Sequence, residues 1–292
     1  MALFDQTDRW LALPAFVKVI AFFVAWGGVW LPVAIPLATL LDWRPPKPLA
    51  PEQKLPILAS LYAIAPLIVW AGSRWEGASF SNYGVFTPNL SSLLMSVGLG
   101  LGLGVLGLAL VFGIQWALGW VDWHPENWGQ AIPILLPILL LGLWISATEE
   151  LVFRGFLFEE LQQDYFIWVA AAIASLIFAF LHLVWERQET IPQLPGLWLM
   201  GMVLTLARWA DGGSLALACG LHAGWIWGLT CLDTAKLITY TGIGSKWMTG
   251  IAEKPLAGIV GILFLLGTAI VIAFIPLLFF LPPPLLSLLL CG

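Results

Sequence analysis

Three short segments of this sequence carry side chains that could activate a water molecule. In the first, Ser146–Gly155, Glu149 and Glu150 are adjacent and Arg154 follows. Residues four apart on a helix can pair a carboxylate with a guanidinium, so Glu150 and Arg154 are predicted partners. Adjacent residues lie about 100° apart around a helix, which leaves Glu149 on another face without a local partner. We therefore predict a structural Glu150 and a Glu149 that acts as a general base. A solvated helix end at the membrane surface is the alternative for both.

The other two segments each place a histidine among apolar residues. The sequence has three histidines: His124, His182 and His222. His182 ends the segment Phe178–His182, and His222 lies about eight residues inside an apolar stretch. Taken alone, His182 could be a core histidine bonded to a carbonyl group one helical turn away. Cys219, one turn before His222, fits a small buried hydrophobe better than a metal ligand.

Composition places these polar residues in a membrane. The 292 residues are 60% hydrophobic and only 10% charged, with a mean hydropathy of +0.93. A soluble domain has about 25% charged residues, so this chain could not cover a surface that faces water. The net charge of −5 leaves no basic patch for nucleic acid. The 18 Trp suit the interfaces of a bilayer, and three Cys without a CxxC motif imply no disulfide framework.

Eight apolar segments approach the length of about 20 residues that crosses the hydrocarbon core. They are 19–41, 55–72, 93–118, 131–148, 166–185, 194–210, 214–234 and 256–281. We expect an all-α, polytopic integral membrane protein with about eight transmembrane helices, and residues 1–292 in one helical membrane domain. Lys and Arg divide almost evenly between the two sides, so neither the orientation nor the kind of membrane follows. The oligomeric state does not follow either.

The three segments can converge if the chain turns between the first two. A helical hairpin of 149–161 and 166–182, turning near Gln162–Asp164, would bring Glu149 and His182 to similar heights. If 131–148 is a full span, however, Glu149 sits at its end and at another depth. A break near Thr148, or a shallow entry through Pro133 and Pro137, would remove that conflict.

Glycines are concentrated in the segment 93–118. Gly102, Gly104 and Gly107 formally match a dinucleotide-binding fingerprint, which also needs a preceding strand and a βαβ unit. The segment also contains Gly98 and Gly100, and small residues at spacing four let membrane helices approach closely. We therefore predict a helix-packing face here.

The ordered pattern of the three segments resembles the CPBP family, which includes CAAX protease and bacteriocin-processing type intramembrane endopeptidases. The matching motifs are Glu149-Glu150-x-x-x-Arg154, Phe178-x-x-x-His182 and His222-Ala223-Gly224-Trp225. The resemblance covers roughly residues 130–235, which would form a catalytic core within the membrane domain.

The resemblance implies an intramembrane endopeptidase that hydrolyses a peptide bond. Glu149, assisted by His182, would activate a water, and His222 would stabilise the oxyanion. Glu150, Arg154 and Phe178 would support them. No cofactor is certain, and a zinc site of Glu149, His182 and His222 is left open. The implied partners are the lipid bilayer and a membrane-associated peptide or prenylated protein substrate.

One position departs from the family pattern. Residue 226 is Ile, where the family motif has an Asn that donates to the oxyanion. Loss of such a donor typically costs ~10²–10³ in rate. Trp227 and Thr230 carry donors, but on other positions of the helix. The alternative function is therefore a non-catalytic membrane scaffold, immunity or assembly factor on the same fold. A transporter or channel is a third hypothesis, which the scarcity of polar groups disfavours.

Overall fold

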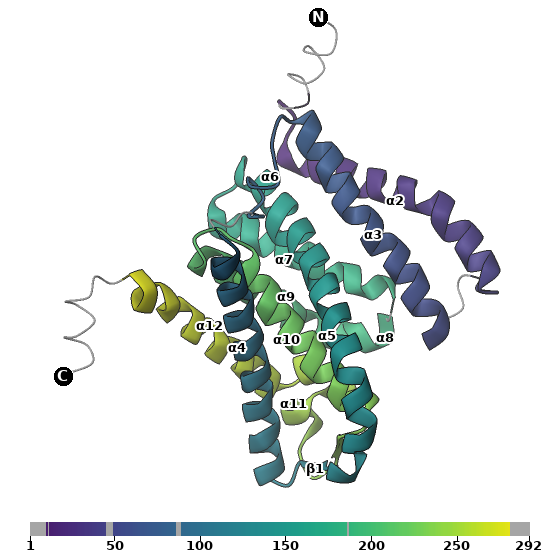
Figure 1. Ribbon diagram of the computed structural model, residues 1–292, viewed down its shortest axis with the longest axis vertical. Helices are drawn as coiled ribbons and strands as arrows, with labels where there is room; N and C mark the ends of the chain where they lie inside the picture. The colour runs from purple at the N-terminus through teal and green to yellow at the C-terminus, as the bar shows by residue number, and fades with distance from the viewer. Residues whose placement is uncertain (1–9, 11, 45–48, 86–88, 186, 281–292) are drawn as a thin grey trace, which may run out of the picture.

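The protein is a bundle of apolar helices in the computed structural model, which describes residues 10, 12–44, 49–85, 89–185 and 187–280 (Figure 1). Each of the eight predicted segments coincides with a helix. These are α2 (Ala15–Leu40), α3 (Pro51–Trp75), α4 (Leu90–Ala117), α5 (Trp128–Glu150), α7 (Ile167–Leu181), α9 (Leu194–Ala210), α10 (Ala216–Thr234) and α12 (Ile259–Phe280). The predicted all-α class is confirmed.

Within the described residues, six helices are long and apolar enough to cross a membrane. They start at Ala15, Glu52, Leu90, Pro125, Ile167 and Arg187, and the helix α10 and the described part of α12 are not among them. The chain is thus an integral, multi-pass membrane protein, but the predicted count of eight spans is not confirmed.

Short elements connect the long helices. They are η1 (Pro125–Asn127), α6 (Phe158–Gln162), η3 (His182–Val184), α8 (Arg187–Thr190), η4 (Ile191–Gln193), α11 (Lys246–Thr249), η5 (Ile251–Glu253) and η6 (Pro255–Ala257). Strands β1 (Val121–Trp123) and β2 (Ile238–Tyr240) form an antiparallel pair in which Val121 lies opposite Tyr240. This ribbon ties the end of α4 to the segment that follows α10.

Helix α10 lies at the centre and packs most extensively against α4 and α5. Glycines on both sides bring α4 and α10 together. A methyl group on Gly104 would lie 2.8 Å from the carbonyl oxygen of Leu221, and one on Gly224 would lie 2.7 Å from that of Leu101. Only glycine allows this approach, so the predicted helix-packing role is confirmed for Gly104. Gly107 faces Phe264 of α12, whereas a methyl group on Gly102 would meet nothing within 4 Å.

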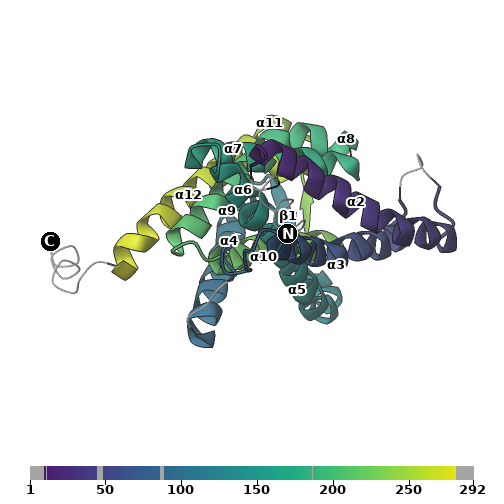
Figure 2. The same cartoon turned by 90° about the horizontal axis from the view of Figure 1, so that it is seen from above.

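The helices α2 and α3 form an antiparallel pair that leans away from this centre. The view from above shows α2 and α3 extending to one side and α12 to the other (Figure 2). Helix α12 packs mainly against α9, and α7 packs against α9 as well. The core therefore consists of α4, α5, α7, α9 and α10, flanked by two outlying elements.

The helical run from Trp128 does not break at Thr148. Helix α5 passes directly into the π-helix η2 (Leu151–Leu157) and then into α6, which ends at Gln162. The predicted hairpin is present, because α7 starts at Ile167 and returns beside this run. The wider turns of η2 follow directly after the two glutamates. A π-helical segment shifts the faces of a helix without interrupting it.

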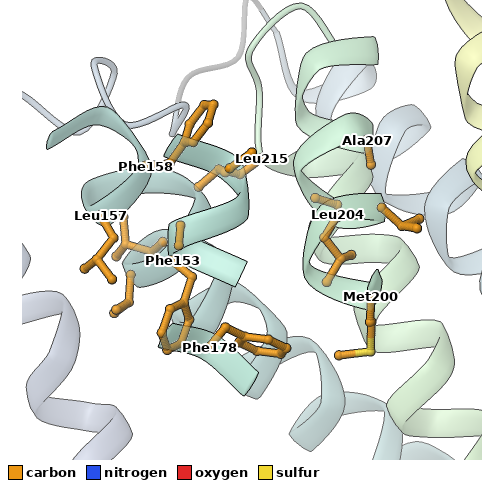
Figure 3. Packing of buried hydrophobic residues seen from close by; sticks show 14 of the residues in the cluster. Phe153, Leu157, Phe158, Phe178, Met200, Leu204, Ala207 and Leu215 are labelled. Carbon is orange, nitrogen blue, oxygen red and sulfur yellow. The ribbon is translucent and has the colours of Figure 1, made fainter. Parts of the chain in front are cut away.

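Buried side chains of η2, α7 and α9 form the apolar core around this hairpin. Phe153 from η2 and Phe178 from α7 lie together, with Met200 and Leu204 of α9 beside them (Figure 3). The rings of Phe153 and Phe178 meet edge to face, with centroids 5.1 Å apart. This packing fixes the two helices that carry Glu149 and His182 relative to each other.

Candidate active site

Glu150 is the centre of a fully buried charge cluster. Its Oε1 accepts hydrogen bonds from Arg154 Nη1 at 3.1 Å and from His222 Nδ1 at 2.8 Å. The exposed fractions of Glu150, Arg154 and His222 are 0%, 1% and 3%. The predicted pair of Glu150 and Arg154 is present, and it also holds the imidazole from α10. A buried carboxylate needs such compensation, because an unpaired buried charge is very costly.

Phe178 connects this cluster to His182. The guanidinium of Arg154 lies over the Phe178 ring, with Cζ 4.3 Å from the centroid. The same ring contacts both His182 and His222, at centroid separations of 4.6 and 6.1 Å. A cation above an aromatic face is stabilised by the ring quadrupole. Phe178 therefore packs against all three polar groups.

Glu149 has a different environment. Its exposed fraction is 8%, so the alternative of a solvated helix end is wrong for both glutamates. The hydroxyl of Tyr62 in α3 donates to Glu149 Oε1, and His222 Nε2 lies 3.6 Å from Oε2. Of the Lys and Arg side chains in the described ranges, none forms an ion pair with Glu149. Its carboxyl is held by a neutral donor and an imidazole.

His182 is held by the backbone of its own helix. Its Nδ1 lies 2.8 Å from the carbonyl oxygen of Phe178, one turn earlier. A carbonyl can only accept, so Nδ1 carries the proton and the neutral ring keeps its lone pair on Nε2. This is the bond expected of a core histidine. It is also the bond that leaves one ring nitrogen available as a base.

Glu149 and His182 line one cavity of about 220 Å³. The polar side chains at its wall are Tyr62, Thr148, Glu149 and His182, and the aromatic ones are Phe23, Trp26, Trp30, Phe153 and Trp185. Helices α2 and α3 form one side of this cavity, and the hairpin of α5–α6 with α7 forms the other. The site is therefore an apolar pocket with a carboxylate and an imidazole at its wall.

The zinc site of Glu149, His182 and His222 stays a prediction. In the part of the chain that the structure describes, no three His, Cys, Asp or Glu side chains are placed to hold one ion. We derive no chemical step through zinc.

Position 226 belongs to the contact between α10 and α5. Gly142 lies two helical turns before Glu149 in α5. A methyl group on Gly142 would lie 3.4 Å from Ile226 Cγ2. The neighbouring Trp227 donates from Nε1 to the carbonyl of Leu135 at 2.8 Å. Trp227 is therefore already engaged and does not replace the motif Asn.

Tyr62 was not predicted as a site residue from the sequence. It lies in the apolar segment 55–72, where Ser60 and Tyr62 are the only hydroxyl-bearing side chains. That scarcity was an available signal, but nothing in the sequence relates Tyr62 to Glu149, which lies 87 residues later.

A family model described as type II CAAX prenyl endopeptidase Rce1-like matches residues 130–228. This model belongs to the CPBP family, and we refer to the matched residues 130–228 as the CPBP domain. It contains Glu149, Glu150, Arg154, Phe178, His182 and His222, which carried the resemblance. The CPBP domain does not include α2 or α3, so Tyr62 lies outside it. Searches of curated proteins and of solved structures found no match.

Proposed function

We propose that this protein is an intramembrane endopeptidase that uses Glu149 and His182 to activate a water molecule. The observation that carries the proposal is the shared cavity, in which a carboxylate and an imidazole with an available Nε2 face one apolar space. A carboxylate and an imidazole can together position and deprotonate one water. The family match supports the proposal, because it spans both residues and its description names an endopeptidase.

The reaction proceeds by addition of water to the peptide carbonyl. The water oxygen bonds to the carbonyl carbon, and the water proton passes to Glu149. As the carbon–nitrogen bond breaks, that proton moves to the leaving amine, so Glu149 returns to its carboxylate form. Water enters as the only co-reactant, and the products are a new carboxyl terminus and a new amino terminus.

His222 is the candidate for stabilising the oxyanion. Glu150, itself bound by Arg154, accepts from Nδ1 of His222, which leaves Nε2 beside Glu149 at 3.6 Å from Oε2. When Nε2 carries a proton, it can donate to negative charge that develops next to Glu149. Glu150, Arg154 and Phe178 act by holding the two imidazoles.

The substrate we propose is a membrane-associated peptide that reaches Glu149 through the aromatic cavity. The cavity wall is apolar, apart from Tyr62, Thr148, Glu149 and His182. A prenylated carboxyl-terminal peptide is the substrate that the description of the matching family names. An apolar pocket favours apolar residues or a lipid chain near the cleaved bond.

The test compares membrane peptides in cells that carry wild-type protein, Glu149→Ala or His182→Ala. His124→Ala and Glu126→Ala are matched controls, because they remove the same residue types from a site outside the cavity. We expect uncut peptides to accumulate in both cavity variants and in neither control, as measured by mass spectrometry. If no peptide accumulates and Glu149→Gln retains full function in cells, the endopeptidase is overturned and the scaffold on the same fold takes its place.

A further inference from the structure

Tyr62 reaches the site from a helix outside the CPBP domain. Its hydroxyl donates to Oε1 of Glu149 and faces the same cavity. We propose that Tyr62 is a positioning residue, which fixes the Glu149 carboxylate so that Oε2 is the oxygen left for the water. The inference rests on the proposed function and assigns to the pair α2–α3 a part in the chemistry.

Helix α2 holds the part of α3 that carries Tyr62 in place. Trp26 donates from Nε1 to the carbonyl oxygen of Leu61 at 3.0 Å, and Trp30 donates from Nε1 to Ser60 Oγ at 2.9 Å. Two indoles of α2 are thus bonded to the two residues that precede Tyr62. Pro66 follows four residues after Tyr62 and has no N–H group, so the helical bond to the Tyr62 carbonyl is missing. The backbone at this point is held by α2.

The same pair is anchored to the CPBP domain at the turn between α6 and α7. The N–H group of Ala15 donates to Asp164 Oδ2 at 2.6 Å, and Lys18 Nζ lies 3.3 Å from Glu160 Oε2. Both members of that ion pair are buried. The ring of Phe22 packs on Phe156 of η2, with centroids 4.7 Å apart. The position of Tyr62 relative to Glu149 therefore depends on contacts at the far end of α2.

A neutral donor suits a carboxylate that must accept a proton. A bond to the charged form stabilises the carboxylate, but without the strong attraction of a fully buried guanidinium. Glu150 has that guanidinium in Arg154, whereas Glu149 has the hydroxyl of Tyr62. With Oε1 occupied by Tyr62, Oε2 remains on the side of His222 Nε2. The tyrosine selects which oxygen is used and leaves the carboxylate able to take a proton.

The variant Tyr62→Phe removes the hydroxyl and keeps the ring, which packs against Trp144 with centroids 6.1 Å apart. Tyr83→Phe is the matched control, since the hydroxyl of Tyr83 donates to another glutamate, Glu76, at 3.5 Å outside the cavity. Both variants are purified as full chains and compared with wild type and with Glu149→Gln.

Two readouts are used. The first is labelling of Glu149 by dicyclohexylcarbodiimide, an apolar reagent for protonated carboxyl groups, quantified by peptide mass spectrometry. Loss of a donor to the charged form favours the protonated form, so Tyr62→Phe is expected to label about fivefold faster, the factor carried by one ordinary hydrogen bond. The second is cleavage of a peptide that accumulates in Glu149→Ala cells. There we expect Tyr62→Phe to lower kcat about tenfold with KM unchanged, because the lost bond acts on the chemical step.

Tyr83→Phe should change neither readout. If Glu149 in Tyr62→Phe is labelled at the same rate as in wild type, or if kcat is unchanged in that variant, the role of Tyr62 is overturned. The labelling does not depend on cleavage, so it decides this inference even if no peptide is cut. Failure of the proposed function shows separately, as equal cleavage by wild type and Glu149→Gln.

Discussion

The helical run from α5 to α6 carries two pairs of adjacent glutamates, ten residues apart, and the two pairs differ in the partners of their carboxylates. In the second pair, Glu159 is bound by Arg208 and Glu160 by Lys18. In the first pair, Glu150 is bound by Arg154, while Glu149 has Tyr62 and His222. Three of the four glutamates have a Lys or Arg partner, and the fourth faces a cavity.

The difference separates carboxylates that hold helices together from one that can react. Breaking a buried pair of a carboxylate and a cation is costly, because it leaves an uncompensated charge. The carboxylate of Glu149 is held instead by a hydroxyl and an imidazole, and it faces the cavity. The same dipeptide thus serves two purposes, according to the residues that other helices bring to it.

The largest effect is expected at the reactive glutamate. Glu149→Gln should lower the cleavage rate by about 10²–10⁴-fold, the contribution typical of a general base. Stability should change by less than about 1 kcal/mol, because the Gln carbonyl can still accept from Tyr62. The checks are the rate with purified protein and its thermal unfolding. If Glu160→Gln lowers the cleavage rate as much as Glu149→Gln does, the two pairs of glutamates do not differ in function as proposed.

The largest effect on stability is expected at Arg154. Arg154→Met leaves Glu150 buried with only His222 as a partner, which should cost about 3–5 kcal/mol. The double variant Glu150→Gln with Arg154→Met should recover part of that loss, because no unpaired charge remains. Chemical or thermal unfolding of the purified variants measures this. If both variants unfold at the wild-type midpoint, the cluster is not structural.

A smaller loss is expected at Lys18. Lys18→Met leaves Glu160 without its cation at the contact between α2 and α6. We expect about 2–3 kcal/mol, less than at Arg154, because α2 lies at the edge of the bundle and can move to admit water. Adding Glu160→Gln should restore stability. Cleavage should fall in Lys18→Met and return in the double variant, because the same contact positions Tyr62.

These contrasts show which parts of the site are local in sequence. Glu150 and Arg154 are four residues apart, so helical spacing alone predicts their pair. The turn at Gln162 follows from polar residues that interrupt an apolar run. Tyr62 could not be found in that way, because packing of α3 against α5 brings it to Glu149. The π-helix η2 has no compositional signal, and the sequence offered a break near Thr148 only as one of two ways to bring Glu149 and His182 to one depth.

The position of Ile226 has a similar explanation. From the sequence, an Ile in place of the motif Asn indicates the loss of a hydrogen-bond donor to the oxyanion. In the structure, residue 226 faces Gly142 across the contact of α10 with α5, so an apolar side chain fits the helix packing there. Which helix faces which depends on glycines far apart in the chain, including Gly104 and Gly224 between α4 and α10. Such contacts arise from tertiary packing and leave no local pattern.

The smallest effect is expected at Glu159, whose side chain is 33% exposed and is the most exposed of the three cation-paired glutamates in the run from α5 to α6. Its partner Arg208 also donates to the carbonyl oxygen of Gly213 at 3.0 Å and to that of Arg154. Glu159→Gln should therefore cost at most about 1 kcal/mol, as for other exposed ion pairs, and should leave cleavage unchanged. Arg208→Met should cost more than Glu159→Gln, because it also removes the donor to the Arg154 carbonyl inside η2. Equal losses in unfolding experiments would mean that the ion pair, and not the bond to the backbone, is what Arg208 contributes.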